Sequence, residues 1–390
     1  MATIVNDRSV NANDISVFTS LQTNKGAVNA TPAFDLVRRL SGTAKRTVAY
    51  TQSGEIKNNQ QGKQQIQDTK TYPAELASEV TQQTKDFLIA ALHAETVDNS
   101  ITDTDIAATS TGFTIPGNQF VAGDYIFLSG LANTDDNRAY NVTSVSGDDI
   151  VTSPAPLALE SAGGSITVNS MKSASGVSQY YYTIQERMLD MSATNDVSHR
   201  TYLDSQINSL TFEVPESGIC TSTASFVSEL PTNGNEAIVG QTDNARDQSD
   251  AVSTVNNIKR FWVVGSDSEC QVKSLTLEIA NNLQEDRSAG CARVGYAGRS
   301  FEATGSLVTK AYISDAREWQ RKYENGTRFN CAVEIEWPAD GKQMIVVIEQ
   351  GIATEHEMPT EANAIASNTL SFACEESLTS GTTITVYSNF

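Results

Sequence analysis

The feature that most constrains the fold of this chain is an internal repeat. The pattern Ile-x-x-x-Thr-x-Ser-Phe-x-x-Glu occurs at 219–229 and again at 365–375. Both copies alternate apolar and polar side chains, which is typical of a half-buried strand. The alternative explanation is a chance coincidence of strand-forming residues. Similarity elsewhere between the two halves of the chain would favour a duplication.

The order of predicted elements also repeats. Ala74-Glu75-Leu76, followed by Val80 and Phe87, is similar to Gly305-Ser306-Leu307, followed by Ala311 and Trp319. In each half a strand and a loop come before a second strand, and then a helix, a strand, a hairpin and a final strand follow.

The two helices of the repeat are short. The first is predicted over Thr81–His93, with an apolar face that includes Phe87 and Leu88. The second is predicted to start at the N-cap Ser314 and to end at Tyr323. In the second half, an alternating strand from Phe329 to Trp337 and an Asp340-Gly341 turn then predict a hairpin.

A stretch of different character interrupts the first copy. Residues 97–172 are rich in Asp, Gly, Ser and Thr, and short strand patterns alternate there with turn signals. Without this stretch, the first copy within 1–235 is nearly as long as the second copy, 236–390. The near equality of the two lengths favours a duplication.

The predicted fold class is therefore mainly β, with two duplicated domains of the β-sandwich or partial-barrel type that have one helix each. The first domain comprises 1–96 and 173–235, with an N-terminal arm at 1–30, and the second comprises 236–390. A small all-β, immunoglobulin-like module at 97–172 is inserted in the first domain.

The charge of the chain excludes several functions. The 27 Lys and Arg against 47 Asp and Glu give a net charge of −20. Proteins that grip nucleic acid or an anionic membrane need clustered cations instead. No apolar run approaches the roughly 20 residues of a membrane span, and the N-terminus does not resemble a secretory signal.

Neither metal binding nor catalysis is predicted. His93, His199 and His356 have no partner residues at ligand spacing, and no catalytic, cofactor-binding or metal-binding residue is assigned. His93 is expected to be a cation at a helix end, and His199 to lie in a polar loop. The five cysteines contain no Cys-x-x-Cys pair and are expected to be free buried thiols of a cytoplasmically made chain: Cys220, Cys270, Cys291, Cys331 and Cys374.

Two acidic pairs and three tryptophans have two possible readings each. Asp135-Asp136 near Asn133, and Asp148-Asp149, could bind calcium, but no twelve-residue ligand loop is present, so turn residues are expected. The tryptophans could stack on sugars or fill a core, and their spacing favours a core or a subunit contact: Trp262, Trp319 and Trp337.

The arrangement of these segments resembles the tail tube (major tail) proteins of long-tailed bacteriophages. The resemblance rests on Gly54-Glu55-Ile56, the strand–helix unit 72–93, the segment 305–312 leading to 322–326, the 340–341 hairpin and the closing strand 371–373. The stretch from Phe113 to Gly164 is similar to small β modules that such proteins often carry.

The resemblance implies a structural virion protein of the phage tail, made in the host bacterial cytoplasm and without enzymatic activity, cofactor or membrane partner. Six tube units would form a ring, and stacked rings would form a hollow tube around a tape-measure protein. Two units per chain predict a trimeric ring with pseudo-sixfold symmetry, a hexamer of chains being the alternative. Tail terminator and distal tail proteins would be further partners, and DNA would pass through the bore without specific binding.

Three expectations follow for the assembled tube. The N-terminal arm, the polar stretch 58–70, which is predicted to be a loop or a solvated hairpin, and the loop 230–253 would make ring-to-ring contacts. Acidic residues would face the channel. The inserted module would project from the outer wall. A virion adhesin or decoration protein that binds host-surface carbohydrate through this module and the tryptophans is the second hypothesis, and an enzyme is the third.

Overall fold

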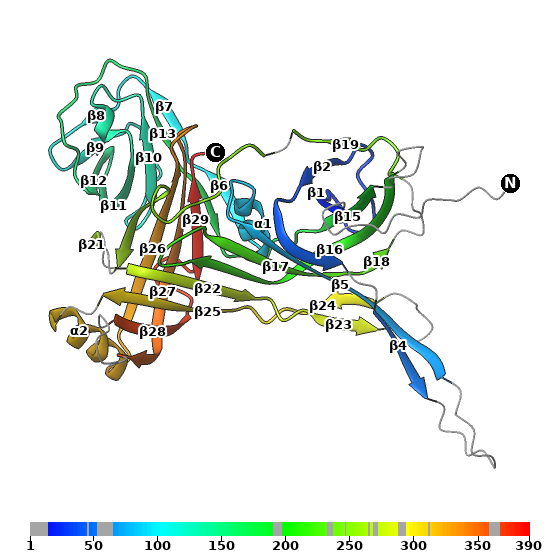
Figure 1. Cartoon of the computed structure of the whole chain (residues 1–390). Helices are drawn as coiled ribbons and strands as arrows, with labels where there is room; N and C mark the ends of the chain where they lie inside the picture. The colour runs from blue at the N-terminus through cyan, green and yellow to red at the C-terminus, as the bar shows by residue number, and fades with distance from the viewer. Residues whose placement is uncertain are drawn as a thin grey trace, which may run out of the picture.

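The computed structural model describes residues 15–44, 47–52, 65–189, 197–231, 237–245, 247–263, 266–267, 272–287, 294–310, 313–358 and 367–390. The fold is mainly β, as predicted, with the two helices α1 and α2 beside large sheets (Figure 1). Within these residues, no helix has the length and apolar character needed to cross a membrane.

The elements fall into three groups along the chain. The first group forms around α1: β1 (Ile15–Leu21), β2 (Ala33–Leu36), β3 (Arg39–Ala44), β4 (Thr47–Gln52), β5 (Gln65–Glu79), α1 (Thr84–Ala91), β6 (Glu95–Asp98), β14 (Met171–Ala174), β15 (Tyr182–Leu189), β16 (Val197–Val214), β17 (Thr221–Ser228) and β18 (Leu230–Pro231). The second group forms around α2: β19 (Thr242–Asp243), β20 (Ile258–Val263), β21 (Ser266–Asp267), β22 (Val272–Ala280), β23 (Gln284–Arg287), β24 (Val294–Ala297), β25 (Glu302–Lys310), α2 (Ile313–Glu324), β26 (Arg328–Trp337), β27 (Lys342–Glu357), β28 (Ser367–Cys374) and β29 (Ile384–Ser388).

The third group lies between β6 and β14 and forms a separate seven-stranded sheet, in the order β7-β13-β10-β11-β12-β9-β8. Its elements are β7 (Ile101–Asp103), β8 (Ala107–Ala108), β9 (Gly112–Thr114), β10 (Tyr125–Ser129), the short 3₁₀ helix η2 (Thr134–Asp136), β11 (Ala139–Ser146), β12 (Asp149–Ser153) and β13 (Ile166–Asn169). This sheet has a hydrophobic core of its own, built around Phe113, Ile126 and Tyr140.

The first two groups share one pattern of antiparallel strand pairs. In the first group the pairs run β1–β15, β15–β16, β16–β17, β17–β5 and β5–β3. In the second group they run β20–β26, β26–β27, β27–β28, β28–β25 and β25–β22. The helix comes after β5 in the first series and after β25 in the second, so element order and pairing order agree.

The irregularities of the ladders repeat as well. The register shifts between Ile207 and Ser209 opposite Phe226, and between Ala353 and Glu355 opposite Phe372. Each of these positions in the second series follows its counterpart at the spacing that separates the two copies of the sequence pattern. Shifts also coincide in the β15–β16 and β26–β27 ladders, and in the β3–β5 and β25–β22 ladders. A β-bulge is a specific local feature, so its recurrence at matching places indicates that the two groups of strands have the same fold.

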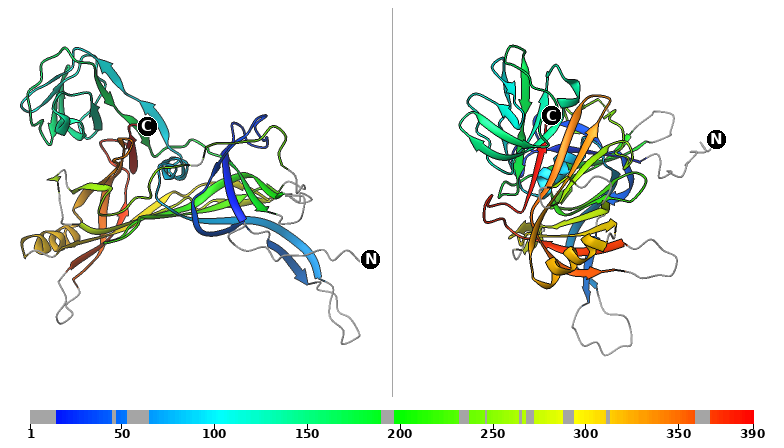
Figure 2. Two further views of the ribbon diagram at one scale, coloured as in Figure 1. Left: turned by 45° about the horizontal axis from the view of Figure 1, so that its top comes forward. Right: turned by 90° about the vertical axis from the view of Figure 1, so that its left-hand side faces the viewer.

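Among the residues that the structure describes, three further pairs link the two groups: β14–β29, β2–β19 and β16–β22. The β16–β22 pair joins their ladders edge to edge into one continuous sheet. Its strands are ordered β3-β5-β17-β16-β22-β25-β28-β27, and we call this set the eight-stranded sheet. It runs horizontally through the molecule in the left view of Figure 2.

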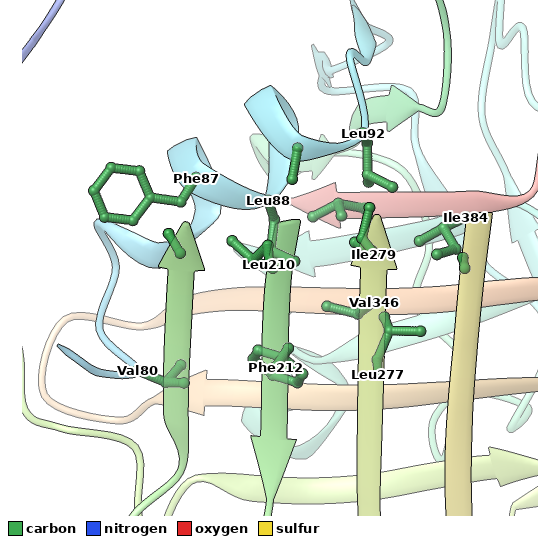
Figure 3. Packing of buried hydrophobic residues seen from close by; sticks show 14 of the residues in the cluster. Val80, Phe87, Leu88, Leu92, Leu210, Phe212, Leu277, Ile279, Val346 and Ile384 are labelled. Atoms are coloured by element: carbon green, nitrogen blue, oxygen red, sulfur yellow. The ribbon is translucent and has the colours of Figure 1, made fainter. Parts of the chain in front are cut away.

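Burial of apolar side chains explains why one face of this sheet is covered. Figure 3 shows Phe87, Leu88 and Leu92 of α1 and its C-terminal turn above Leu210 and Ile279 of the sheet. At α2, Trp319 packs edge-to-face on Phe329, which packs on Phe372 in the same way. Fully burying side chains of this size contributes roughly 1.5–3 kcal/mol each.

The seven-stranded sheet also packs against the second group. Tyr125 and Phe127 of β10 pack with Trp262 of β20 and Tyr387 of β29 in a separate apolar cluster. It therefore sits on the second group, on the same side of the eight-stranded sheet as α1 in both Figure 1 and Figure 2.

The structure tests several local predictions. Ser314 lies inside α2, which begins at Ile313, so it is not the N-cap. Residues 65–70 belong to β5 and pair with β4, which agrees with the hairpin alternative for the polar stretch 58–70. Residues 58–64, and 1–14 of the predicted N-terminal arm 1–30, lie outside the described residues. Ile15–Leu21 of the arm form β1, which pairs with β15. The described part of 230–253 is irregular apart from the short strands β18 and β19.

Candidate functional site: the open face and edges of the eight-stranded sheet

The face of the eight-stranded sheet that points away from the helices is polar; we call it the open face. The strands β17, β22, β25 and β28 alternate buried residues toward the helices with more accessible residues toward this face. One row of cross-strand partners crosses it from β5 to β27: Glu79, Thr221, Glu213, Thr276, Ser306, Ser371 and Glu355. Hydroxyl and carboxylate groups therefore make up this row.

Negative charge predominates on the open face. Its strands carry glutamates, most of them exposed, at these positions: Glu75, Glu79, Glu213, Glu278, Glu302, Glu355 and Glu357. Lys310 is also on this face at the end of β25, and Arg38 lies 3.5 Å from the Glu79 carboxylate. A surface of this kind repels phosphate groups and offers neutral hydroxyls between the charges.

The eight-stranded sheet has two free edges within the described residues. At one end β3 pairs with β5, and no described strand pairs on its other side. At the other end Glu355–Glu357 of β27 pair with β28 only. Free edges present unpaired backbone N–H and C=O groups that can pair with another strand.

The three histidines do not form a common site. His93 is buried after α1, and burial, with the nearby Arg299 guanidinium, lowers its pKa to about 4. It is therefore neutral at pH 7, and the expected helix-end cation is wrong. His199 lies in β16 and not in a loop, and burial next to Arg187 lowers its pKa as well. His356 lies in β27 opposite Leu370.

The acidic pairs form hydrogen bonds within the inserted module. Asp136 is 1% exposed and accepts hydrogen bonds from the backbone N–H groups of Leu157 and Ala158 and from the Tyr140 hydroxyl. Asp148 and Asp149 likewise bond within the module, to Gly117 and Thr114. In the part of the chain that the structure describes, no group of His, Cys, Asp and Glu is arranged to hold a metal ion.

Tryptophans and cysteines belong to the interior. The three tryptophans are all buried, so none offers a face for sugar stacking, as the core reading predicted: Trp262, Trp319 and Trp337. Cys220 and Cys331 are buried free thiols and Cys374 is half-buried and free. Burial raises the pKa of each of these thiols to about 12. Cys270 and Cys291 lie outside the described residues.

A polar cleft of about 850 Å³ separates the inserted sheet from the second group. Its polar groups are mainly paired with one another. Asp124 accepts from Lys172 Nζ at 2.8 Å and from the Tyr387 hydroxyl at 3.0 Å, and Glu349 accepts from Thr385 at 2.7 Å. Burial raises the pKa of Glu349. The Asp124 contacts hold the inserted sheet in place. None of these three contacts places a nucleophile beside a general base.

Sequence reasoning did not find the open face as a site. It expected acidic residues on one surface without placing them, because assigning a face to a strand requires knowing which strands it joins. The available signal was period-two alternation of apolar residues with polar ones, such as Glu75 and Glu79 in β5 and Thr276 and Glu278 in β22.

Comparison with known proteins agrees with this geometry. Residues 13–375 match the model of a family described as phage tail tube protein. No curated protein matches the chain. Because the family match covers nearly the entire chain, the protein is a structural component of a phage tail tube and belongs to the phage tail tube protein family.

Proposed function

We propose that the open face of the eight-stranded sheet lines the bore of the tail tube, and that three chains complete one ring. Each chain would contribute two equivalent units, namely 1–96 with 173–235, and 236–390, so that a ring has six. The module at 97–172 would be an addition to the first unit. The rings would stack into the hollow tube that conducts DNA to the host.

The observation that carries this proposal is the β16–β22 pair. It connects two groups of strands that share pairing order and bulge positions, and it connects them edge to edge in one sheet. Continuing the same step from chain to chain would give a closed wall of alternating units, which removes all free edges.

The chemistry of the open face supports passage of DNA. Glutamates and hydroxyls line it, whereas a DNA-binding surface would present clustered Lys and Arg. Carboxylates in a channel would keep the phosphate backbone away from the wall. DNA would therefore slide through without being held, and no catalytic step is involved.

The remaining contacts of the tube follow from the position of each segment. The N-terminal arm, the loop 58–70 and the segment 230–253 would contact neighbouring rings. The inserted module would lie on the outer wall, since it sits on the helix side of the sheet. The tape-measure protein would fill the bore before ejection, and the tail terminator and distal tail proteins would close the ends.

Electron microscopy of the purified protein tests the tube directly. Hollow fibres of uniform width are expected after assembly. Compact particles that never form fibres, at any salt or protein concentration tested, would contradict the proposal. The adhesin hypothesis gains no support from the tryptophans, because all three are buried.

A further inference from the structure

The two units differ at their outer edges in a way that their shared fold does not explain. β3 in the first unit and β22 in the second occupy the same place, since both pair with the strand before the helix and both have a bulge at the same position. β22 is covered by β16, whereas no described strand covers the matching side of β3.

Two charged side chains bond to the free side of β3. Arg39 Nη1 donates to the Gly42 carbonyl at 2.8 Å, and the Ala44 N–H donates to Glu186 Oε1 at 2.9 Å. Gly42 and Ala44 are next-but-one neighbours in the strand, so their backbone groups point to the same side of it. The Gly42 carbonyl and the Ala44 N–H bond to side chains and not to β5. They therefore lie on the side of β3 that faces away from β5.

The second unit has apolar residues at both matching positions. The bulge alignment places Val272 where the first unit has Arg39. The β15–β16 and β26–β27 ladders place Val333 where it has Glu186. The charged pair therefore occurs at the edge that the chain leaves open, and valines occur at the edge that it covers with its own strand.

The other end of the sheet shows the complementary feature. Met358, directly after β27, corresponds to Phe212 of β16 at the spacing of the sequence repeat. Phe212 is fully buried and faces Leu277 of β22, but Met358 is 39% exposed. Leu40, the bulge residue of β3, is 58% exposed. Apolar side chains are thus uncovered at both free edges.

We propose that Arg39 and Glu186 guard the β3 edge of the unassembled chain, and that residues 355–358 of a second copy pair with the end of this edge and displace Glu186 from Ala44. The inference rests on the proposed ring. Its register follows from the β16–β22 pair: Ser209 faces Ala280 and Phe212 faces Leu277, so Glu355 would face Thr47 of the next copy and Met358 would face Ala44.

Disulfide trapping tests the register. Glu355→Cys and Thr47→Cys chains are mixed, assembled and oxidised, with Glu355→Cys plus Ser41→Cys as the out-of-register control. A covalent two-chain product is expected from the first mixture and not from the second. The reverse result, or no product from tubes that assemble normally, would overturn the proposed pairing while leaving the tube itself intact.

Assembly kinetics test the guards. The double variant Arg39→Val with Glu186→Val carries the residues of the covered edge. It should assemble about tenfold faster, because it removes the charge-assisted bond that the incoming strand must break at Ala44, together with the neighbouring bond at Gly42. Glu75→Val on an interior strand is the matched control and should not. An unchanged or slower rate in the double variant would contradict the guarding role.

A backbone variant checks the same edge independently of side-chain charge. Met358→Pro removes the N–H that would face the neighbouring β3, whereas Met358→Ala keeps it. Folded chains that form no rings are expected for the proline variant, with ring formation by the alanine variant. Normal rings from Met358→Pro would rule out this joint, and absence of tubes from the wild-type chain would contradict the proposed function.

Discussion

Gly305 and Phe372 face each other across β25 and β28, so closely that a Cβ at position 305 would lie 2.4 Å from the Phe372 ring. The matching pair of the first unit is Ala74 and Phe226, where a Cβ is accommodated. Gly305→Ala should therefore destabilise the protein by about 1–3 kcal/mol through overpacking. Chemical denaturation measures this, with Ser306→Ala on the open face as the control. Equal stability of both variants would show that the ring can move aside.

The same comparison shows what the sequence can and cannot predict. Alternation in β17 and β28, and the apolar face of the first helix, are local periods, and they predicted elements that the structure confirms. The pairing of β16 with β22 joins segments that are far apart in the sequence and leaves no local period. The roles of Arg39 and Glu186 were likewise hidden, because they depend on which side of β3 stays free.

The packing of the inserted sheet on the second unit depends on Asp124. Asp124 is 3% exposed and accepts hydrogen bonds from Lys172 and Tyr387. Asp124→Asn removes the charge that both donors approach, and should cost about 1–2 kcal/mol. Faster hydrogen exchange in β10, which packs on the second unit, is the expected sign. Asp135→Asn, at an exposed position of the same module, should leave the exchange rates of β10 unchanged.

Protonation of His93 should destabilise the fold in mild acid. Its folded pKa of about 4 lies below the ordinary value of 6.5, so the unfolded chain takes up the proton first as the pH falls. Its contribution to stability is complete above pH 6.5 and decreases toward pH 4, by at most about 3 kcal/mol. Burial also lowers the pKa of His199, so its protonation should likewise decrease the stability of the fold as the pH falls.

The matched variant for this test is His93→Asn. His93 has a φ of 50°, a left-handed conformation that asparagine tolerates well. The free energy of unfolding of the variant should change less than that of the wild type between pH 6.5 and 4.5. Parallel curves for the two proteins would mean that His93 does not titrate differently on folding.

Reversing charge on the open face should make the bore hold DNA. Glu213→Lys with Glu278→Lys places cations on two adjacent strands of the eight-stranded sheet. Assembled tubes of this variant should retain duplex DNA fragments at low salt and release them as salt increases, because phosphate binding releases counterions. Glu376→Lys, at an exposed position off this sheet, is the control. Equal retention by both variants would indicate that the open face does not line the bore.

The number of chains in one ring tests the central claim most directly. Each chain contains two units of matching strand order joined by β16 and β22, and the account predicts six units per ring. Native mass spectrometry of rings released from purified tubes should therefore give three times the mass of the chain. A ring of six chains would contradict the account.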